Sequence, residues 1–319
     1  MRVAASIALL AAAACAHAQE LSLDAGLTRS RVPEDTSFGL GLNYTHPLAS
    51  HLAASIGYRN EGHIPNHHRD GMAAQLWLLG SAFSPELTFG VGAGPYHYFD
   101  TTVAEGRSTL EFNDAHGWGY MYSGTATWRP PNSKWFYELR LEHIETSRNI
   151  DTTLLMAGIG YRLDQDSSFR AHSSGHAFAA ERNDEVFVGG GQTIVNSFES
   201  QSAGAASAAW RHAFGPVLRG SVGWLHEGDA RLIRRDGVTT LAWAEPSFGD
   251  DRFTLGFGAG GYFSVDRYRP GSKDVLGLVS TTASVRMSDH WVARFMWHRV
   301  ASRHDRDSDI LLLGLGGQF

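Results

Sequence analysis

Residues 52–61 (LAASIGYRNE) and residues 218–227 (LRGSVGWLHE) decide the fold class. In the first stretch an apolar side chain stands at every second position from Leu52 onward, and the positions between them end in Arg59 and Glu61. Side chains of a β-strand point alternately to opposite faces, so this pattern predicts a strand with one apolar and one polar face. In a membrane barrel those faces meet lipid outside and a polar lumen inside.

Both stretches belong to a long internal repeat. Residues 52–100 align with residues 218–266 at a constant offset of 166, and 17 of the 49 aligned positions are identical. Residues 137–163 match residues 293–319 more weakly, at an offset of 156. The identical positions include Glu61-Gly62 with Glu227-Gly228, Arg69-Asp70-Gly71 with Arg235-Asp236-Gly237, Trp77 with Trp243, and Asp100 with Asp266. A unit of about 150 residues is long for a solenoid repeat and corresponds to one eight-stranded barrel or to half of a sixteen-stranded one.

Alternating segments continue along the chain, and the links between them are by turns short and long. Short turns are expected at residues 47–51, 83–86, 130–134, 214–217 and 287–290, and longer links at residues 60–71, 102–117, 226–237 and 266–274. This alternation is typical of barrels with short periplasmic turns and long external loops. We therefore expect an all-β protein, an antiparallel transmembrane β-barrel of sixteen strands from two eight-strand repeats.

Two ways of closing those strands are open. We favour a single sixteen-stranded barrel, in which residues 19–163 and 185–319 each supply eight strands and residues 164–184 form a polar periplasmic linker. The alternative is two tandem eight-stranded barrels. The glycines that recur on the lumen face support this alternative, because a narrow interior must be packed with side chains.

The two ends of the chain indicate export to the outer membrane. Residues 1–18 have the pattern of a secretory signal, with Arg2, an apolar stretch and the cleavage site Ala16-His17-Ala18. Lipidation at Cys15 is the competing interpretation. The last strand ends in Phe319 and resembles the C-terminal strand of Gram-negative outer-membrane β-barrels. That resemblance implies recognition of Phe319 by the barrel assembly machinery, and outer-membrane lipid and lipopolysaccharide as surroundings.

Composition narrows the function classes. The formal net charge of −6 argues against nucleic acid as a partner. The only cysteine, Cys15, lies in the expected signal, so neither a disulfide framework nor a cysteine-based metal site is expected. The chain has no apolar run of 18 residues, so no transmembrane helix is expected.

The repeated polar motifs are expected at the external end, because both termini are expected in the periplasm. The candidate residues of this external rim are Glu61, Arg69, Asp70, Asp100, Glu227, Arg235, Asp236 and Asp266. Glu–Arg pairs there can hold loops together, or they can bind sugar or phosphate, for which arginine supplies a matching fork. His63, His67, His68 and His97 occur only in the first copy and lack a fixed ligand spacing, so we assign no metal and no cofactor.

Charges on the polar face suggest a channel. The residues expected to line the lumen are Arg59, Glu61, Glu138, Arg140, Glu142, Arg219, Arg294 and His298. Their mixed sign predicts a pore for small polar or carbohydrate solutes without strong ion selectivity.

Two other classes stay open. A lipid-modifying hydrolase of the outer leaflet would need a serine, a histidine and an acid, as in the groups around His143 or Ser302. The resemblance to outer-membrane lipid A deacylases is architectural only, and we assign no catalytic residue. A non-conducting surface or adhesion barrel is the third class.

Overall fold

The computed structural model describes residues 19–103, 111–163, 183–197, 199–215, 217–248, 252–269, 273–302 and 306–319. The expected signal and most of the expected linker lie outside these residues. The chain divides into two compact units, and each is described by itself.

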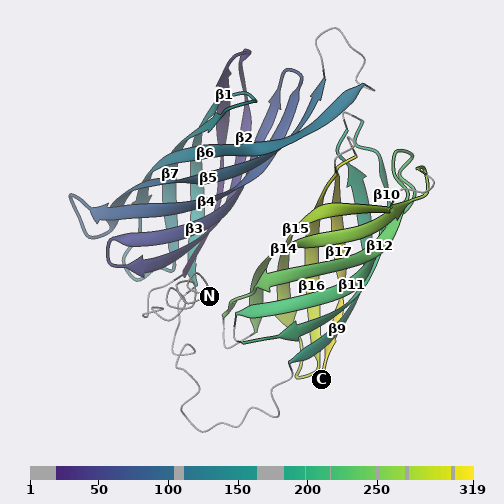
Figure 1. Ribbon diagram of the computed structural model, residues 1–319. Helices are drawn as coiled ribbons and strands as arrows, with labels where there is room; N and C mark the ends of the chain where they lie inside the picture. The colour runs from purple at the N-terminus through teal and green to yellow at the C-terminus, as the bar shows by residue number, and fades with distance from the viewer. Residues whose placement is uncertain are drawn as a thin grey trace, which may run out of the picture. The chain divides into compact units, whose positions relative to one another are not determined.

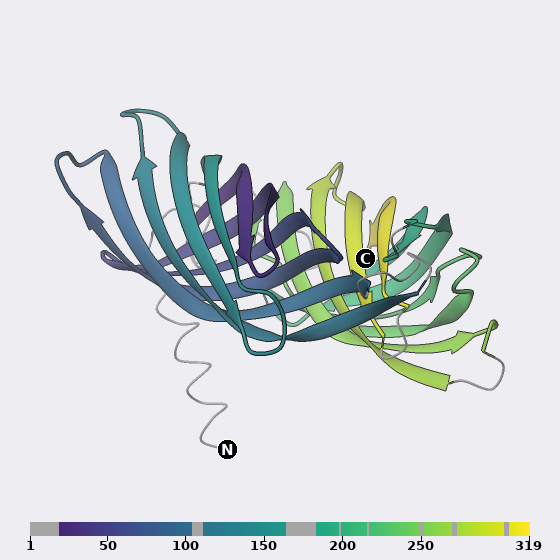
Figure 2. The ribbon, with the colours of Figure 1, turned by 90° about the horizontal axis from the view of Figure 1, so that it is seen from above.

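The first unit is a closed antiparallel barrel of eight strands (Figure 1). The strands are β1 (Gln19–Arg31), β2 (Glu34–Ala49), β3 (Leu52–Ile64), β4 (His67–Ser81), β5 (Leu87–Val103), β6 (Phe112–Trp128), β7 (Trp135–Thr146) and β8 (Thr152–Leu163). Strands adjacent in sequence pair with one another, and β8 returns to pair with β1 from Gln19↔Leu163 to Ser30↔Thr152. Figure 2 shows the purple β1 beside the teal β8 at this seam.

The second unit is also a barrel of eight long strands. These strands are β9 (Asp184–Val195), β10 (Ser202–Ala213), β11 (Leu218–His226), β12 (Arg235–Ala244), β14 (Phe253–Asp266), β15 (Lys273–Arg286), β16 (Trp291–Ala301) and β17 (Ser308–Gln318). A two-residue strand, β13 (Ser247–Phe248), adds only to the edge of β14. The barrel closes because β12 pairs with β14 and β17 pairs with β9.

The chain therefore forms two tandem eight-stranded barrels, the alternative that the sequence left open. The single sixteen-stranded closure that we favoured is not the one observed, because β8 pairs with β1 and β17 with β9. Each seam brings two backbones very close at a glycine. A Cβ atom on Gly26 would collide with the carbonyl oxygen of Leu155, and one on Gly191 with that of Leu311.

The expected alternation of faces is present along the strands. Leu76 and Leu78 of β4 are more than 60% exposed on the outside of the first barrel, and the alternate residues Ala73, Gln75 and Trp77 are buried inside. Exposed aromatic rings occur toward both ends of the outer walls, including Trp118, Tyr120, Trp128, Trp135, Trp224 and Trp291. Such rings suit the headgroup level of a membrane. The described residues contain no helix that is long and apolar enough to cross a membrane.

Each barrel has a terminal end, which holds its first and last residues, and an opposite end that we call distal. The distal link expected at residues 60–71 is mostly strand, because β3 runs to Ile64 and β4 starts at His67. Only Pro65 and Asn66 form the turn, and Asn66 has a left-handed φ of 63°. The corresponding link in the second barrel is an eight-residue loop, residues 227–234.

Candidate functional site

A tryptophan fills the lumen at equivalent places in the two barrels. Trp77 and Trp243 are 3% and 1% exposed. The Nε1 atom of Trp77 donates to Ser55 Oγ at 2.7 Å, and that of Trp243 donates to Ser221 Oγ at 2.8 Å. Gly92 faces the Trp77 ring, where a Cβ atom would lie 2.6 Å from it. The alternating glycines therefore make room for a ring that occupies the lumen.

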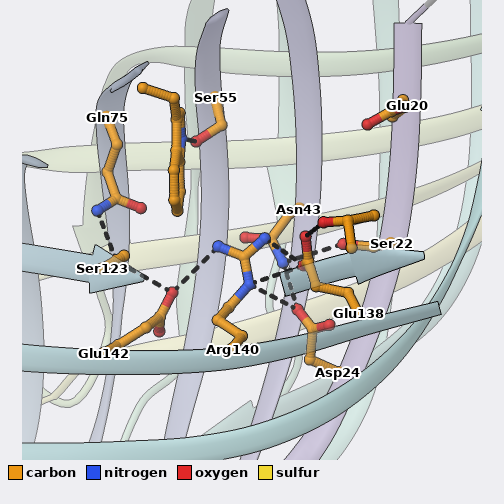
Figure 3. Close-up of polar contacts among 12 residues, drawn as sticks. Glu20, Ser22, Asp24, Asn43, Ser55, Gln75, Ser123, Glu138, Arg140 and Glu142 are labelled. Carbon is orange, nitrogen blue, oxygen red and sulfur yellow. Dashed lines mark hydrogen bonds and ion pairs between the residues drawn. The ribbon is translucent and has the colours of Figure 1, made fainter. Parts of the chain in front are cut away.

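The first barrel holds a buried ion network beside this ring. The Arg59 guanidinium donates through Nε and Nη2 to the two carboxylate oxygens of Glu142, each at 2.5 Å. Arg140 lies between Glu142 on one side and Glu138 and Asp24 on the other (Figure 3). Its distances are 2.5 Å to Glu138, 3.3 Å to Glu142 and 3.5 Å to Asp24. We call these five residues the central network of the first barrel.

Neutral side chains connect the network to further strands. Asn43 Nδ2 donates to Asp24 Oδ2 at 2.5 Å and to Ser22 Oγ at 3.2 Å. Gln75 donates to Ser123 Oγ at 2.8 Å, and Ser123 in turn donates to Glu142 at 3.5 Å. The Arg140 guanidinium also lies 5.1 Å from the centre of the Trp77 ring. Ring and network thus form one packed layer across the lumen.

The second barrel has a central network made of different residues. Glu245 accepts from Arg211 at 2.5 Å and lies 3.1 Å from Arg219 and 3.3 Å from Arg294. Arg294 also pairs with Glu185 at 2.9 Å. The Arg211 guanidinium lies 4.9 Å from the centre of the Trp243 ring. His298 belongs to the same interior, where its Nδ1 lies 2.6 Å from Ser280 Oγ.

These contacts show that the lumen of each barrel is occupied by paired side chains. All eight residues expected to line it belong to strands β3, β7, β11 and β16, and each is on the inward face. They are buried or partly buried and paired, whereas the expectation of a pore assumed that they meet water. An eight-stranded barrel is just wide enough for its side chains to fill the interior. Removing one partner of such a buried pair is strongly destabilising.

A second kind of contact closes the distal end. Arg69 donates through Nε and Nη2 to the carboxylate of Glu61 at 2.7 and 2.5 Å, and Nη2 also donates to Thr152 at 2.8 Å. Tyr96 donates its hydroxyl to Glu61 at 2.7 Å. Arg69 Nη1 donates to the carbonyl oxygen of Ile150. We call Glu61, Arg69 and Thr152 the distal latch of the first barrel.

The second barrel repeats this latch at equivalent positions. Arg235 donates to Glu227 at 2.8 Å and to Ser308 at 2.9 Å, and the Ser308 hydroxyl donates to Glu227 at 2.6 Å. Ser308 corresponds to Thr152 at the offset of 156. Glu61, Arg69, Glu227 and Arg235 thus point inward and pair. The loop-holding interpretation describes their contacts, and a ligand-binding role for them stays a prediction.

The other four rim candidates have other hydrogen-bond partners, although Asp100 and Asp266 pair in register with Arg69 and Arg235. Asp100 is 2.6 Å from His67 Nδ1, and Asp266 accepts backbone N–H groups of the neighbouring loops. Asp70 accepts from the Tyr58 hydroxyl at 2.8 Å, and Asp236 pairs with His226. Asp70 and Asp236 therefore do not join the latch residues of their own barrels in one site.

The histidine and serine groups have other partners. His143 Nδ1 is 3.1 Å from Thr153 Oγ1, and no hydrogen bond within the described residues joins it to Ser147. His304 and Asp305 lie outside those residues. His63 and His68 face each other with ring centroids 4.1 Å apart. The described residues contain no group of three or more His, Cys, Asp or Glu side chains suited to a metal ion.

Four central residues were not among the sequence candidates. Asp24, Glu185 and Arg211 stand at inward positions of β1, β9 and β10, so the period of two could have identified them. Glu245 directly follows β12 and precedes Pro246, which made it resemble a turn residue.

No family model matches the chain, and no curated protein matches its sequence. Among solved structures, the chain is similar to the N-terminal β-barrel domain of Pseudomonas aeruginosa OprF, at 12% identity and a TM-score of 0.36, over 46% of this chain and 99% of that one. It is similar to Neisserial surface protein A at 14% identity and a TM-score of 0.35, over 46% and 96%. It is also similar to the Ralstonia pickettii toluene transporter TbuX at 9% identity and a TM-score of 0.25, over 96% and 90%.

Closed barrels with apolar outer walls and aromatic rings toward both ends place the chain in the class of outer-membrane β-barrel proteins. Within that class it is a tandem of two eight-stranded barrels, each with a lumen occupied by its own side chains.

Proposed function

We propose that this protein is a non-conducting barrel of the bacterial outer membrane that acts at the cell surface through its distal ends. The observation that carries the proposal is the packed layer in each lumen, in which Arg59, Glu142, Arg211 and Glu245 have 0–1% exposure. A pore for small polar or carbohydrate solutes, which the sequence favoured, needs a wet lumen at this level. The buried pairs weigh against that pore and for the surface barrel.

Planar-bilayer recording of the full chain tests this proposal. We expect no stepwise current from the refolded wild type, because the central ion pairs are buried in both lumens. A reproducible unitary conductance would restore the pore. Unchanged lipopolysaccharide after incubation with the protein is expected too, and turnover of radiolabelled lipopolysaccharide would instead support the hydrolase class.

Export and orientation belong to the same proposal. We expect Sec-dependent export, cleavage after Ala18, and a periplasmic linker at residues 164–184. Tags at Pro65, Gly106 or Arg231 should be reachable on intact cells, and a tag at Asn132 should not. The reverse labelling would refute this orientation, and an acylated Cys15 would refute the cleavage.

The C-terminal residue is the proposed contact with the assembly machinery. The Phe319 side chain is 64% exposed, so its ring is accessible. Deleting Phe319 should lower the yield of heat-modifiable barrel in membranes while leaving refolding in detergent intact. A normal yield in membranes would count against this contact.

A further inference from the structure

Two neighbouring loops at the distal end of the second barrel expose four arginines. Arg231 and Arg234 belong to the loop between β11 and β12, and Arg267 and Arg269 follow β14. The Arg267 and Arg234 side chains are 61% and 45% exposed. Arg234 lies 3.9 Å from Asp229, a contact that leaves most of its donors open to another ligand. Within the described part of the chain, no carboxylate pairs with Arg231 or Arg269.

Hydrogen bonds hold the two loops together. The Tyr268 hydroxyl donates to Asp229 on the other loop, and this bond lowers the pKa of the Asp229 carboxyl. The backbone N–H of Arg267 donates to the carbonyl oxygen of Arg234 at 2.9 Å. Asp266 Oδ1 accepts from the backbone N–H groups of Arg234 at 3.3 Å and Tyr268 at 3.0 Å. Hydrogen bonds thus connect residues 227–234 with residues 267–269, and we call these two loops, which carry the four arginines, the platform.

The platform is also anchored from below. Ala230 and Ile233 are 1% and 0% exposed and form a small apolar cluster with Val195 of β9. Anchored loops lose little freedom when a ligand binds, and such preorganisation increases affinity. The exposed arginines and their buried neighbours thus have separate roles in the same loop.

The platform stands directly above the apolar outer wall. Asp236 pairs in register with Val265, whose side chain is exposed on the outside of β14. Arg267 Nη2 lies 3.3 Å from Asp236 Oδ2, which places this guanidinium on the same outward side. Trp224 and Phe263, 45% and 50% exposed, continue the wall toward the middle of the barrel. A cationic rim above an apolar wall fits a lipid with an anionic headgroup.

We propose that Arg231, Arg234, Arg267 and Arg269 form a binding site for the phosphate groups of an outer-leaflet lipid. Guanidinium groups bind phosphate oxygens in bidentate fashion, and the wall below accepts acyl chains. The proposal rests on the outer-membrane placement proposed above. It is specific to the second barrel, because the equivalent positions of the first barrel hold Pro65, His68, Thr101 and Val103.

Lipid titrations followed by native mass spectrometry test the site on the full chain in an uncharged detergent. The probes are diphosphorylated lipid A, its dephosphorylated form, and soluble inositol hexakisphosphate. Replacing Arg234→Gln together with Arg267→Gln should lower the affinity for diphosphorylated lipid A by about tenfold or more, because two charge-assisted contacts are lost. The dephosphorylated lipid should bind the wild type about as weakly as the phosphorylated lipid binds this variant.

The matched control removes Arg29 and Arg31, two exposed arginines at the distal end of the first barrel. The Arg29→Gln/Arg31→Gln variant should bind like the wild type. Equal affinity of the wild type and the Arg234/Arg267 variant would overturn the proposal. Equally tight binding of inositol hexakisphosphate would overturn the lipid source in favour of a soluble anion. Micelle binding is independent of orientation in cells, so surface labelling at Arg231 tests the proposed function separately.

Discussion

The two barrels solve the same packing problem with different charges. The central network of the first barrel has two arginines and three carboxylates, and that of the second has three arginines and two carboxylates. Few of these residues correspond: Arg59 aligns with Leu225, Arg140 with Met296, and Glu138 with Arg294. The tryptophan, its serine partner and the distal latch, by contrast, occupy equivalent positions in both.

This difference shows which parts of the interior are set by geometry. The tryptophan ring needs a glycine opposite it and a hydroxyl near Nε1, and both barrels supply them at matching positions. Charge pairing can be achieved from several strands, so the two networks have diverged in composition. The first network has one carboxylate in excess and the second has one arginine in excess. Removing a carboxylate should therefore change the stability of the two barrels differently.

The largest effect is expected for Glu245→Gln. Glu245 is within 3.3 Å of three arginines, and its loss leaves only Glu185 to balance them. We expect a loss of about 3–5 kcal/mol in the free energy of unfolding. Urea unfolding in detergent micelles, followed by tryptophan fluorescence, measures it.

Asp24→Asn provides the contrast in the first barrel. The network there has a carboxylate in excess, and Asp24 Oδ1 has no hydrogen-bond partner among the described residues. We expect a change within about 1 kcal/mol, since less charge is left buried. Similar losses for Glu245→Gln and Asp24→Asn would show that charge balance does not distinguish the barrels.

Arg140→Ala comes next in size. Three carboxylates surround Arg140, and Trp77 stacks beneath it. A wet pore would lose about 0–1 kcal/mol from this change, whereas the packed lumen should lose about 3 kcal/mol. Urea unfolding distinguishes the two values. An unchanged unfolding midpoint of the variant, together with a measurable conductance of the wild type, would support the pore.

Removing the arginine of each distal latch should give a smaller difference in the free energy of unfolding. Arg69 donates two hydrogen bonds to Glu61 and one each to Thr152, Asn149 and the carbonyl oxygen of Ile150, whereas Arg235 donates one each to Glu227 and Ser308. Arg69→Ala should therefore cost about 2 kcal/mol more than Arg235→Ala, because it breaks three more hydrogen bonds. Thermal unfolding of both variants checks the order, and the reverse order would mean that contacts beyond the latch dominate.

The smallest difference is expected at the tryptophan. Ser55→Ala and Ser221→Ala each leave a buried indole N–H without its partner, at a cost of about 1–2 kcal/mol. Because the two donor–acceptor distances are 2.7 and 2.8 Å, the two variants should have nearly equal urea midpoints. Clearly unequal midpoints would show that the two tryptophans are held differently.

Much of this architecture follows from local sequence pattern. The period of two in residues 52–61 identifies the strands, and parity alone places Arg59 and Glu142 inside. The repeated Glu61 and Arg69 indicated a Glu–Arg pair, which both barrels contain. Parity places these side chains on the inward face because side-chain direction in a strand depends only on position.

The strand pairing that closes each barrel, and the filling of the lumen by paired side chains, could not be derived in the same way. The choice between one barrel and two depends on which distant strand β8 meets, and no local pattern specifies that partner. The equivalent glycines Gly26 and Gly191 mark the two seams, but their role appears only when the partner strands are known. The charge partners of Asp24 and Glu185 come from strands far along the chain, so inward charges alone did not distinguish a pore from a packed lumen.

Disulfide trapping tests the central claim of two separate closures most directly. Ala25 and Ala157 are register partners across the β1–β8 seam, and Leu313 stands at the position of β17 that corresponds to Ala157. Register partners in a sheet lie close enough for a disulfide to span them. With Cys15 replaced by alanine, Ala25→Cys with Ala157→Cys should crosslink in isolated outer membranes, and Ala25→Cys with Leu313→Cys should not. The opposite result, a crosslink between residues 25 and 313 only, would show that β1 pairs with β17 in a single sixteen-stranded barrel.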